Sequence, residues 1–189
     1  MMPIPDSVAP VSFGGLATQI RRSSNFRFNW QWFSLDAVPA ASSSAARGIF
    51  DNLVSEPACH RFLQESFKAL YDAAFTIEPI HEHCRIVDAT HEFDGILARA
   101  ATDRLGAYSR ELVDAPASEV MAVRELLGPV FPYKVFTLHP GEVTNCPACK
   151  SYNNHLFTNW FYQVAWDWCF CLLPHGTPTA WIGCLTDTD

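Results

Sequence analysis

The sequence predicts an α+β fold, namely a single domain with a mostly antiparallel sheet, about four helices packed on one face of that sheet, and a C-terminal β-hairpin. Two observations support this prediction. Strand-like segments lie at both ends of the chain, and helical segments lie between them. In residues 160–172, moreover, every second side chain is large and apolar, which is typical of a strand with one buried face. That apolar row consists of Trp160, Tyr162, Val164, Trp166, Trp168, Phe170 and Leu172.

The N-terminal part of the chain divides at about residue 24. Residues 1–24 contain three prolines and the pair Gly14-Gly15, which predicts an irregular arm, and residues 25–189 form the expected domain. The domain begins with a second alternating segment, whose apolar face is formed by Phe26, Phe28, Trp30 and Trp32. This pattern predicts a half-buried strand.

Four helices are expected between the two ends of the chain. The first begins after the serines 42–44, which are good helix caps, and the second begins after Ser55 and Pro57. The third is expected at residues 93–112, and the fourth at residues 118–127, before the stop signal Gly128-Pro129. The remaining strands are expected at residues 83–88 and 133–138, and at residues 180–185, which pair with 160–172 across the turn-rich residues 174–178.

The net charge of −7 is unevenly distributed along the chain. Residues 51–120 contain six basic and thirteen acidic side chains, so that this segment alone carries −7. A nucleic-acid backbone requires clustered Lys and Arg, and we therefore expect no nucleic-acid partner. An acidic surface suits a basic protein partner, although it also serves solubility. The candidate contact residues are Glu65, Asp72, Glu78, Asp88, Glu92 and Asp94, together with Asp167, which would lie on the open face of the sheet.

Cysteine usage and the N-terminus indicate the compartment. Seven cysteines, an odd number with irregular spacing, do not predict a secreted disulfide framework. The first residues lack the charged and apolar regions of a signal peptide, and no apolar run is long enough to span a bilayer. We therefore expect a cytoplasmic protein without membrane association.

The sharpest local motif is the pair Cys146 and Cys149, separated by two residues. Two thiolates at this spacing can bind one Zn²⁺, but a structural site needs two further ligands. The chain has no second pair of this kind, so His155 and Cys169 are the candidate ligands, with Cys171 on the same strand face as Cys169. A structural zinc site and a plain turn with two reduced thiols both remain open. A redox pair is less favoured, because the motif does not begin a helix.

A second group of metal-binding residue types is formed by His81 and His83, with His91 downstream. On a strand the first two would point the same way, as metal ligands should. Surface or capping histidines are the simpler interpretation. The familiar motifs of nucleophilic hydrolases, phosphate-binding loops and zinc proteases are missing from the sequence. The sequence therefore favours a binding protein over an enzyme.

In size, charge and single-domain organisation the chain is similar to the small acidic immunity proteins that neutralise bacterial toxins. The resemblance implies a cytosolic inhibitor that covers a basic surface with carboxylates, and it assigns no role to any single residue. The alternative function is a zinc-binding protein or metal-dependent enzyme that uses Cys146 and Cys149. A carrier of an apolar ligand is a third interpretation, and it is disfavoured because the aromatic row is needed to build the core.

Overall fold

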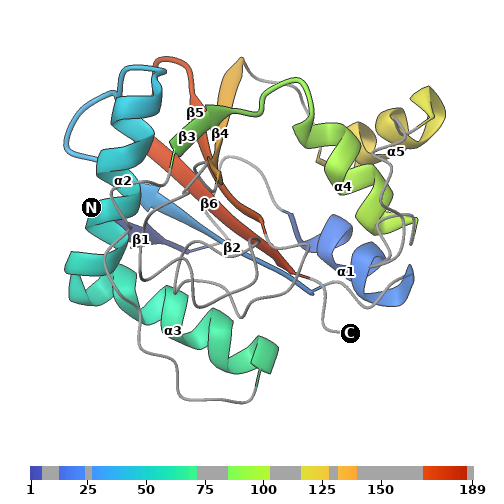
Figure 1. The fold of residues 1–189 in the computed structure, drawn as a ribbon, viewed down its shortest axis with the longest axis horizontal. Coiled ribbons are helices and arrows are strands. Elements are labelled where there is room, and N and C mark those ends of the chain that lie inside the picture. Colours follow the sequence, from blue (N-terminus) through green and yellow to red (C-terminus); the bar gives the residue numbers. More distant parts are fainter. Residues whose placement is uncertain are drawn as a thin grey trace, which may run out of the picture.

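The computed structural model describes residues 1–5, 13–23, 27–71, 85–102, 116–127, 132–139 and 168–186. Within these ranges the chain forms one sheet of six strands in the order β1-β2-β6-β5-β4-β3, with every neighbouring pair antiparallel. Strands and helices together form an α+β fold (Figure 1), as the sequence predicts. The strands are β1 (Met2–Ile4), β2 (Arg27–Ser34), β3 (Arg85–Asp88), β4 (Tyr133–His139), β5 (Trp168–Pro174) and β6 (Thr179–Thr186).

Five helices accompany the sheet within the described residues, and most of their starts agree with the sequence-based expectation. They are α1 (Gly14–Ser23), α2 (Ser43–Ser55), α3 (Pro57–Tyr71), α4 (Phe93–Ala101) and α5 (Ala117–Leu127). Helix α2 begins at the expected serines, because the Ser42 hydroxyl accepts a hydrogen bond from the backbone N–H of Ala45 at 3.3 Å. Such a bond satisfies one of the free N–H groups at a helix N-terminus.

The helices cover both faces of the sheet, whereas the sequence suggested one covered face (Figure 1). Helices α1, α4 and α5 pack on what we call the aromatic face, which carries Phe28, Trp32, Phe170 and Trp181. Helices α2 and α3 pack on the opposite side, which we call the cysteine face because it carries Cys169, Cys171 and Cys184. The sheet is therefore the middle layer of three.

The reason for this difference lies in the small side chains of β5. Its even positions belong to the aromatic face, and its odd positions, Cys169, Cys171 and Leu173, belong to the cysteine face and are as deeply buried. Cysteine behaves as a small apolar residue when it is buried. The alternation of large and small residues therefore marks two buried faces of unequal side-chain size, and not one buried face and one open face.

Packing on the aromatic face is dominated by ring contacts around Trp181, which is fully buried in β6. The ring of Phe13, just before α1, stacks on Trp181 with centroids 4.4 Å apart. The ring of Phe93, at the start of α4, meets Trp181 edge-on at 5.8 Å and Phe170 edge-on at 5.1 Å. Both arrangements are favourable for aromatic rings. This cluster ties two helices to the centre of the sheet.

The C-terminal hairpin is confirmed within the described residues. Strand β5 pairs with β6, and the connecting turn contains Gly176 in the left-handed region at φ +73°. Glycine adopts this conformation without steric cost. The expected strand at 160–172 is described only from Trp168 onward. Within the range 93–112 expected to be one helix, α4 ends at Ala101 with Thr102 as its C-cap, and residues 103–112 lie outside the described residues.

The segment expected to be an irregular arm contains two regular elements. Strand β1 pairs with β2 through Met2, Pro3 and Ile4, and helix α1 contributes Leu16, Ala17 and Ile20 to the core. A proline is tolerated in β1 because this strand lies at the edge of the sheet. The expectation of irregular structure gave too much weight to the prolines and to Gly14-Gly15, which here begins the helix. None of the helices in the described ranges combines the length and the apolar character that crossing a bilayer requires.

Candidate functional site

The acidic residues proposed to contact a partner occupy different environments. Glu65 is exposed on α3, and Asp88 and Glu92 are exposed at the end of β3 and just before α4. Asp94, in contrast, is 5% exposed. The other three candidates, Asp72, Glu78 and Asp167, lie outside the described residues. The structure therefore does not bring these carboxylates together as one described surface.

Asp94 joins three elements of the fold. One of its carboxylate oxygens accepts a hydrogen bond from Nε of Arg124 on α5 at 2.6 Å, and the other accepts from the Tyr133 hydroxyl on β4 at 3.2 Å. A buried carboxylate with two such donors is internally satisfied. Contrary to the sequence-based expectation, Asp94 is thus a structural residue and does not present its charge on the surface.

Tyr133 is affected by the same arrangement. Burial and the nearby Asp94 carboxylate together raise the pKa of the Tyr133 hydroxyl to about 12. Both causes act in the same direction, since ionised tyrosine is unfavourable in a buried site and next to a negative charge. The hydroxyl therefore stays protonated and donates its hydrogen bond to Asp94 across the whole physiological pH range.

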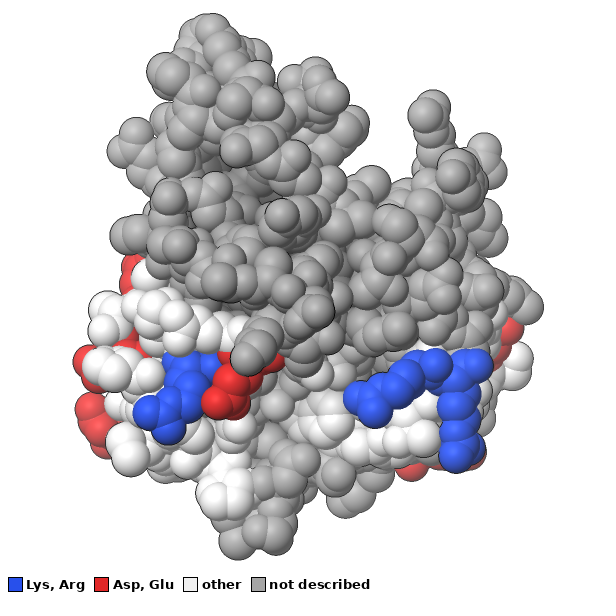
Figure 2. All heavy atoms as spheres, turned by 90° about the horizontal axis from the view of Figure 1, so that it is seen from below, with Lys and Arg blue, Asp and Glu red and all other residues white. Residues whose placement is uncertain are grey.

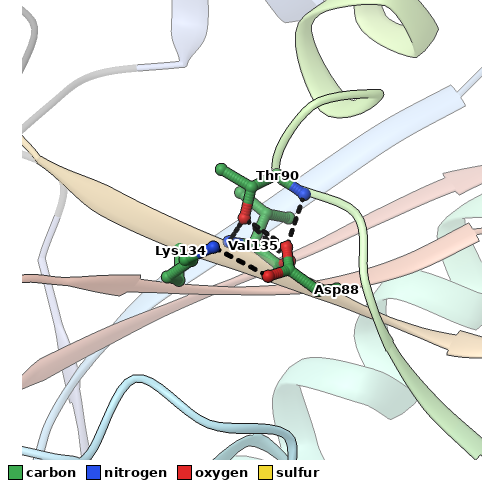
Figure 3. Close-up of polar contacts among 4 residues, drawn as sticks. All are labelled: Asp88, Thr90, Lys134 and Val135. Atoms are coloured by element: carbon green, nitrogen blue, oxygen red, sulfur yellow. Dashed lines mark hydrogen bonds and ion pairs between the residues drawn. The ribbon is translucent and has the colours of Figure 1, made fainter.

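Asp88 forms a network at the surface, where β3 ends beside β4 (Figure 3). Its carboxylate accepts from Nζ of Lys134 at 2.8 Å, from the Thr90 hydroxyl at 2.5 Å and from the Thr90 backbone N–H at 3.0 Å. The Thr90 hydroxyl in turn accepts from the backbone N–H of Val135 at 3.0 Å. These hydrogen bonds, first those from Lys134 and Thr90, lower the pKa of Asp88 to about 2. Asp88 thus holds the end of an edge strand to its neighbour.

Charge is balanced over the part of the chain that the structure describes. These ranges contain nine acidic and ten basic residues and so carry +1, and the remaining segments, with eleven acidic and three basic residues, carry −8. Figure 2 shows two separate groups of Lys and Arg side chains on one face of the molecule, one of which lies directly beside carboxylates. We call the part of the chain that the structure describes the described frame. On this face the described frame is therefore not an acidic surface.

The proposed zinc ligands are described only in part. Cys146, Cys149 and His155 lie outside the described residues, and so do His81 and His83, while His91 is exposed. Cys169 is fully buried on the cysteine face, where its Sγ lies 3.8 Å from Sγ of Cys184. Among the described residues no three histidine, cysteine or acidic side chains converge in a manner that would hold a metal ion. The zinc site stays a prediction, and elemental analysis of the purified protein tests it.

The position of Cys171 agrees with the expectation that it shares a strand face with Cys169. Both thiols are completely buried, and burial raises the pKa of each of them, that of Cys169 also through its contact with Cys184. A thiol with a raised pKa is a poor metal ligand and a poor nucleophile, because both functions require the thiolate. Neither side chain is accessible to a partner or substrate in this conformation.

Two close contacts were not foreseen from the sequence. The Asp94 cluster joins residues far apart in the chain, and no motif indicates it. The contact of Cys169 with Cys184 depends on the hairpin register, which places these residues directly opposite each other. The sequence located the turn at residues 174–178, but a slip of one residue would have placed Cys169 opposite Gly183. Register is decided by packing on both faces of the sheet, which the turn residues alone do not specify.

The chain was compared with family models, with curated proteins and with solved structures, and no match was found in any of the three comparisons. The functional argument therefore depends on the residues of this chain alone.

Proposed function

We propose that this protein is a non-catalytic binding protein that recognises a basic protein partner, in the manner of an immunity-type inhibitor. The observation that carries the proposal is the separation between the fold and the excess charge. The described frame is close to neutral, and its carboxylates Asp51, Asp88 and Asp94 are paired with cations of the same frame. The excess of acidic side chains belongs to the other segments of the sequence.

A net charge of one sign is unfavourable for a compact protein because like charges repel, and it becomes favourable when a partner of opposite charge binds. Segments 72–84 and 103–115 contain six of the acidic residues and only two basic ones. Charge of one sign raises the association rate with a partner of the other sign, often by orders of magnitude at low salt. Glu65 and Glu92 are described and exposed carboxylates close in sequence to these segments.

The proposal is tested with a variant in which Glu65, Asp72 and Glu78 are replaced by their amides. The tagged full chain and this variant are used to capture partners from lysate of the source cells at low and at high salt. We expect the wild type to retain a basic protein at low salt, to release it at high salt, and the variant to lose it. The association rate of the captured protein is then measured against both forms.

A matched control carries the same change of charge at exposed carboxylates elsewhere in the chain. The control replaces Asp36, Glu56 and Glu125, all exposed in the structure, by their amides. If this control weakens binding as much as the first variant, binding reflects net charge and not a specific surface. If no basic protein is retained, or if only substitutions of apolar residues abolish retention, the electrostatic proposal is wrong.

A further inference from the structure

The cysteine face contains two thiols that are paired by the sheet itself. Cys169 on β5 and Cys184 on β6 are direct partners in the antiparallel register, and their Sγ atoms lie 3.8 Å apart. Directly opposed residues of an antiparallel pair have Cα atoms about 4.5 or 5.5 Å apart, according to the type of pair, and both values fall within the range that a disulfide bridges. The backbone therefore already has the separation that a cross-strand disulfide needs.

The sulfur atoms need only a short movement to bond. A disulfide has an S–S length of about 2.05 Å, so that rotation of the two side chains must bring the sulfurs closer by roughly 1.8 Å. Cys171 makes a useful comparison, since it lies on the same face of β5 but is opposite Ile182. Cys59, the other described cysteine, directs its thiol to the backbone oxygen of Met1 at 3.7 Å. Among the described thiols, the close contact is between Cys169 and Cys184.

We propose that Cys169 and Cys184 are a redox-active pair that closes into a cross-strand disulfide by exchange with a low-molecular-weight disulfide. In the first step the thiolate of one cysteine attacks a sulfur of the small disulfide and displaces one small thiolate. In the second step the other cysteine, as thiolate, attacks the protein sulfur of this mixed disulfide and displaces the second small thiolate. The protein loses two electrons and two protons, and the small disulfide becomes two thiols.

Burial decides when this exchange takes place. Cys169 is 0% and Cys184 1% exposed, so that neither thiol can be reached from solution in the folded protein. The folded, reduced protein therefore reacts slowly, because the small disulfide has no access to either sulfur. During folding, or when the hairpin opens locally, the thiols are accessible, and the sheet then selects these two as partners.

The experiment refolds the reduced full chain in glutathione buffers that range from strongly reducing to strongly oxidising. Remaining thiols are alkylated, and the protein is digested with pepsin at acidic pH, where disulfides do not rearrange. Trypsin is unsuitable, because no lysine or arginine follows Lys150. We expect mass spectrometry to find a linked pair of peptides containing Cys169 and Cys184, and the thermal unfolding midpoint of this form to be higher than that of the reduced form. Native reduced protein in the same buffers should form the link at least tenfold more slowly.

Two variants complete the test. Cys171→Ala removes the neighbouring thiol and should still form the link when it refolds, whereas Cys169→Ala cannot form it and thereby confirms the assignment of the linked peptides. The proposal is overturned if Cys169 and Cys184 remain open to alkylation in every buffer. It is equally overturned if the wild type links either of them mainly to another cysteine.

Discussion

Asp88 and Asp94 show how strongly the surroundings of a carboxylate decide its role. The two residues are six positions apart in the sequence, and each has a cationic partner. The sequence pattern gives no reason to expect different roles for them. Asp88 lies at the surface, where water and salt weaken its ion pair with Lys134. Asp94 is buried between two helices and a strand, where its carboxylate accepts hydrogen bonds from both Arg124 and the Tyr133 hydroxyl.

Replacement of Asp88 by asparagine should reduce stability only at pH values where the carboxylate is ionised in the fold. The pKa of Asp88 falls from 3.8 to about 2 in the folded protein, so its contribution is complete above about pH 4 and is lost as the pH falls through about 2. At neutral pH we expect a loss of at most about 1 kcal/mol, as for exposed ion pairs. Urea unfolding of both forms between pH 2 and 7 measures this difference, and a difference that grows towards acidic pH would contradict the assignment.

Replacement of Asp94 by asparagine should lower the pKa of Tyr133. The value of about 12 results first from burial and then from Asp94, so that removal of the negative charge brings the pKa part of the way back to its ordinary value of 10. Tyrosine absorbance during alkaline titration measures the shift. In the wild type, stability should decrease as the pH rises from about 10 to 12, because the unfolded chain ionises first. An unchanged Tyr133 titration in the variant would show that the two groups do not interact.

At the scale of single elements, β6 depends on a glycine. A Cβ atom at Gly183 would lie 2.0 Å from the ring of Trp181, which is itself fully buried and stacked on Phe13. The indole ring folds back over its own strand, and only hydrogen at position 183 leaves room for it. In the antiparallel register this position is paired with Trp30 of β2.

The exchange Gly183→Ala should therefore destabilise the protein by about 1–3 kcal/mol, the range for overpacked cores. Gly48→Ala is the matched control, because nothing lies within 4 Å of the added methyl group on helix α2. In a helix this exchange is expected to stabilise by up to about 1 kcal/mol. Chemical denaturation of the two variants measures the change in the free energy of unfolding, which should be a loss for Gly183→Ala and a gain for Gly48→Ala. Equal effects at both glycines would mean that the Trp181 ring does not occupy this position.

Most elements of the described fold could be predicted from local signals, and their arrangement in space could not. The serine cap of α2, the period of β2 and the turn at Gly176 are all local features of the sequence, because a few adjacent residues determine them. Which face a helix covers depends on contacts between residues far apart in the chain. The cysteines of β5 misled the prediction, since a thiol fits a polar position and an apolar position equally well in a sequence pattern.

The candidate site was less predictable than the fold. Exposed Glu65 and Glu92 agree with their expected place on the surface, but Asp94 does not, and its partners Arg124 and Tyr133 come from other elements. Burial of a carboxylate depends on the packing of the surrounding elements. An acidic residue in the first turn of a helix gives the same local sequence pattern whether its side chain is exposed or buried. The predicted zinc ligands Cys146, Cys149 and His155 lie outside the described residues, so their prediction is unchanged.

At the scale of the whole molecule, two cores of similar depth hold the helices to opposite faces of one sheet. Leu53 of α2 lies in the core of the cysteine face, and Leu97 of α4 lies in the core of the aromatic face, both with no exposed surface. Both layers of helices therefore bury part of the hydrophobic core. The stability of the molecule should therefore respond to a cavity on either side of the sheet.

The matched substitutions Leu53→Ala and Leu97→Ala test this expectation. Each removes the same atoms from a fully buried position, and each should cost about 2–5 kcal/mol. Urea denaturation at neutral pH provides both free energies of unfolding. If Leu53→Ala costs no more than a surface substitution while Leu97→Ala is severe, the cysteine face is open in solution and the sheet has one covered side only.

The order of the strands has a consequence for behaviour at high concentration. Among the strands that the structure describes, the long strands β2, β4, β5 and β6 are interior, and the short strands β1 and β3 form the two edges. Pro3 lacks a backbone N–H to offer at one edge, and Arg85 and Asp88 place charges at the other. Free edges are where sheets of separate molecules join into aggregates. The long strands of this sheet therefore do not offer unpaired N–H and C=O groups to other copies of the chain. We expect the protein to remain monodisperse when it is concentrated, as measured by light scattering.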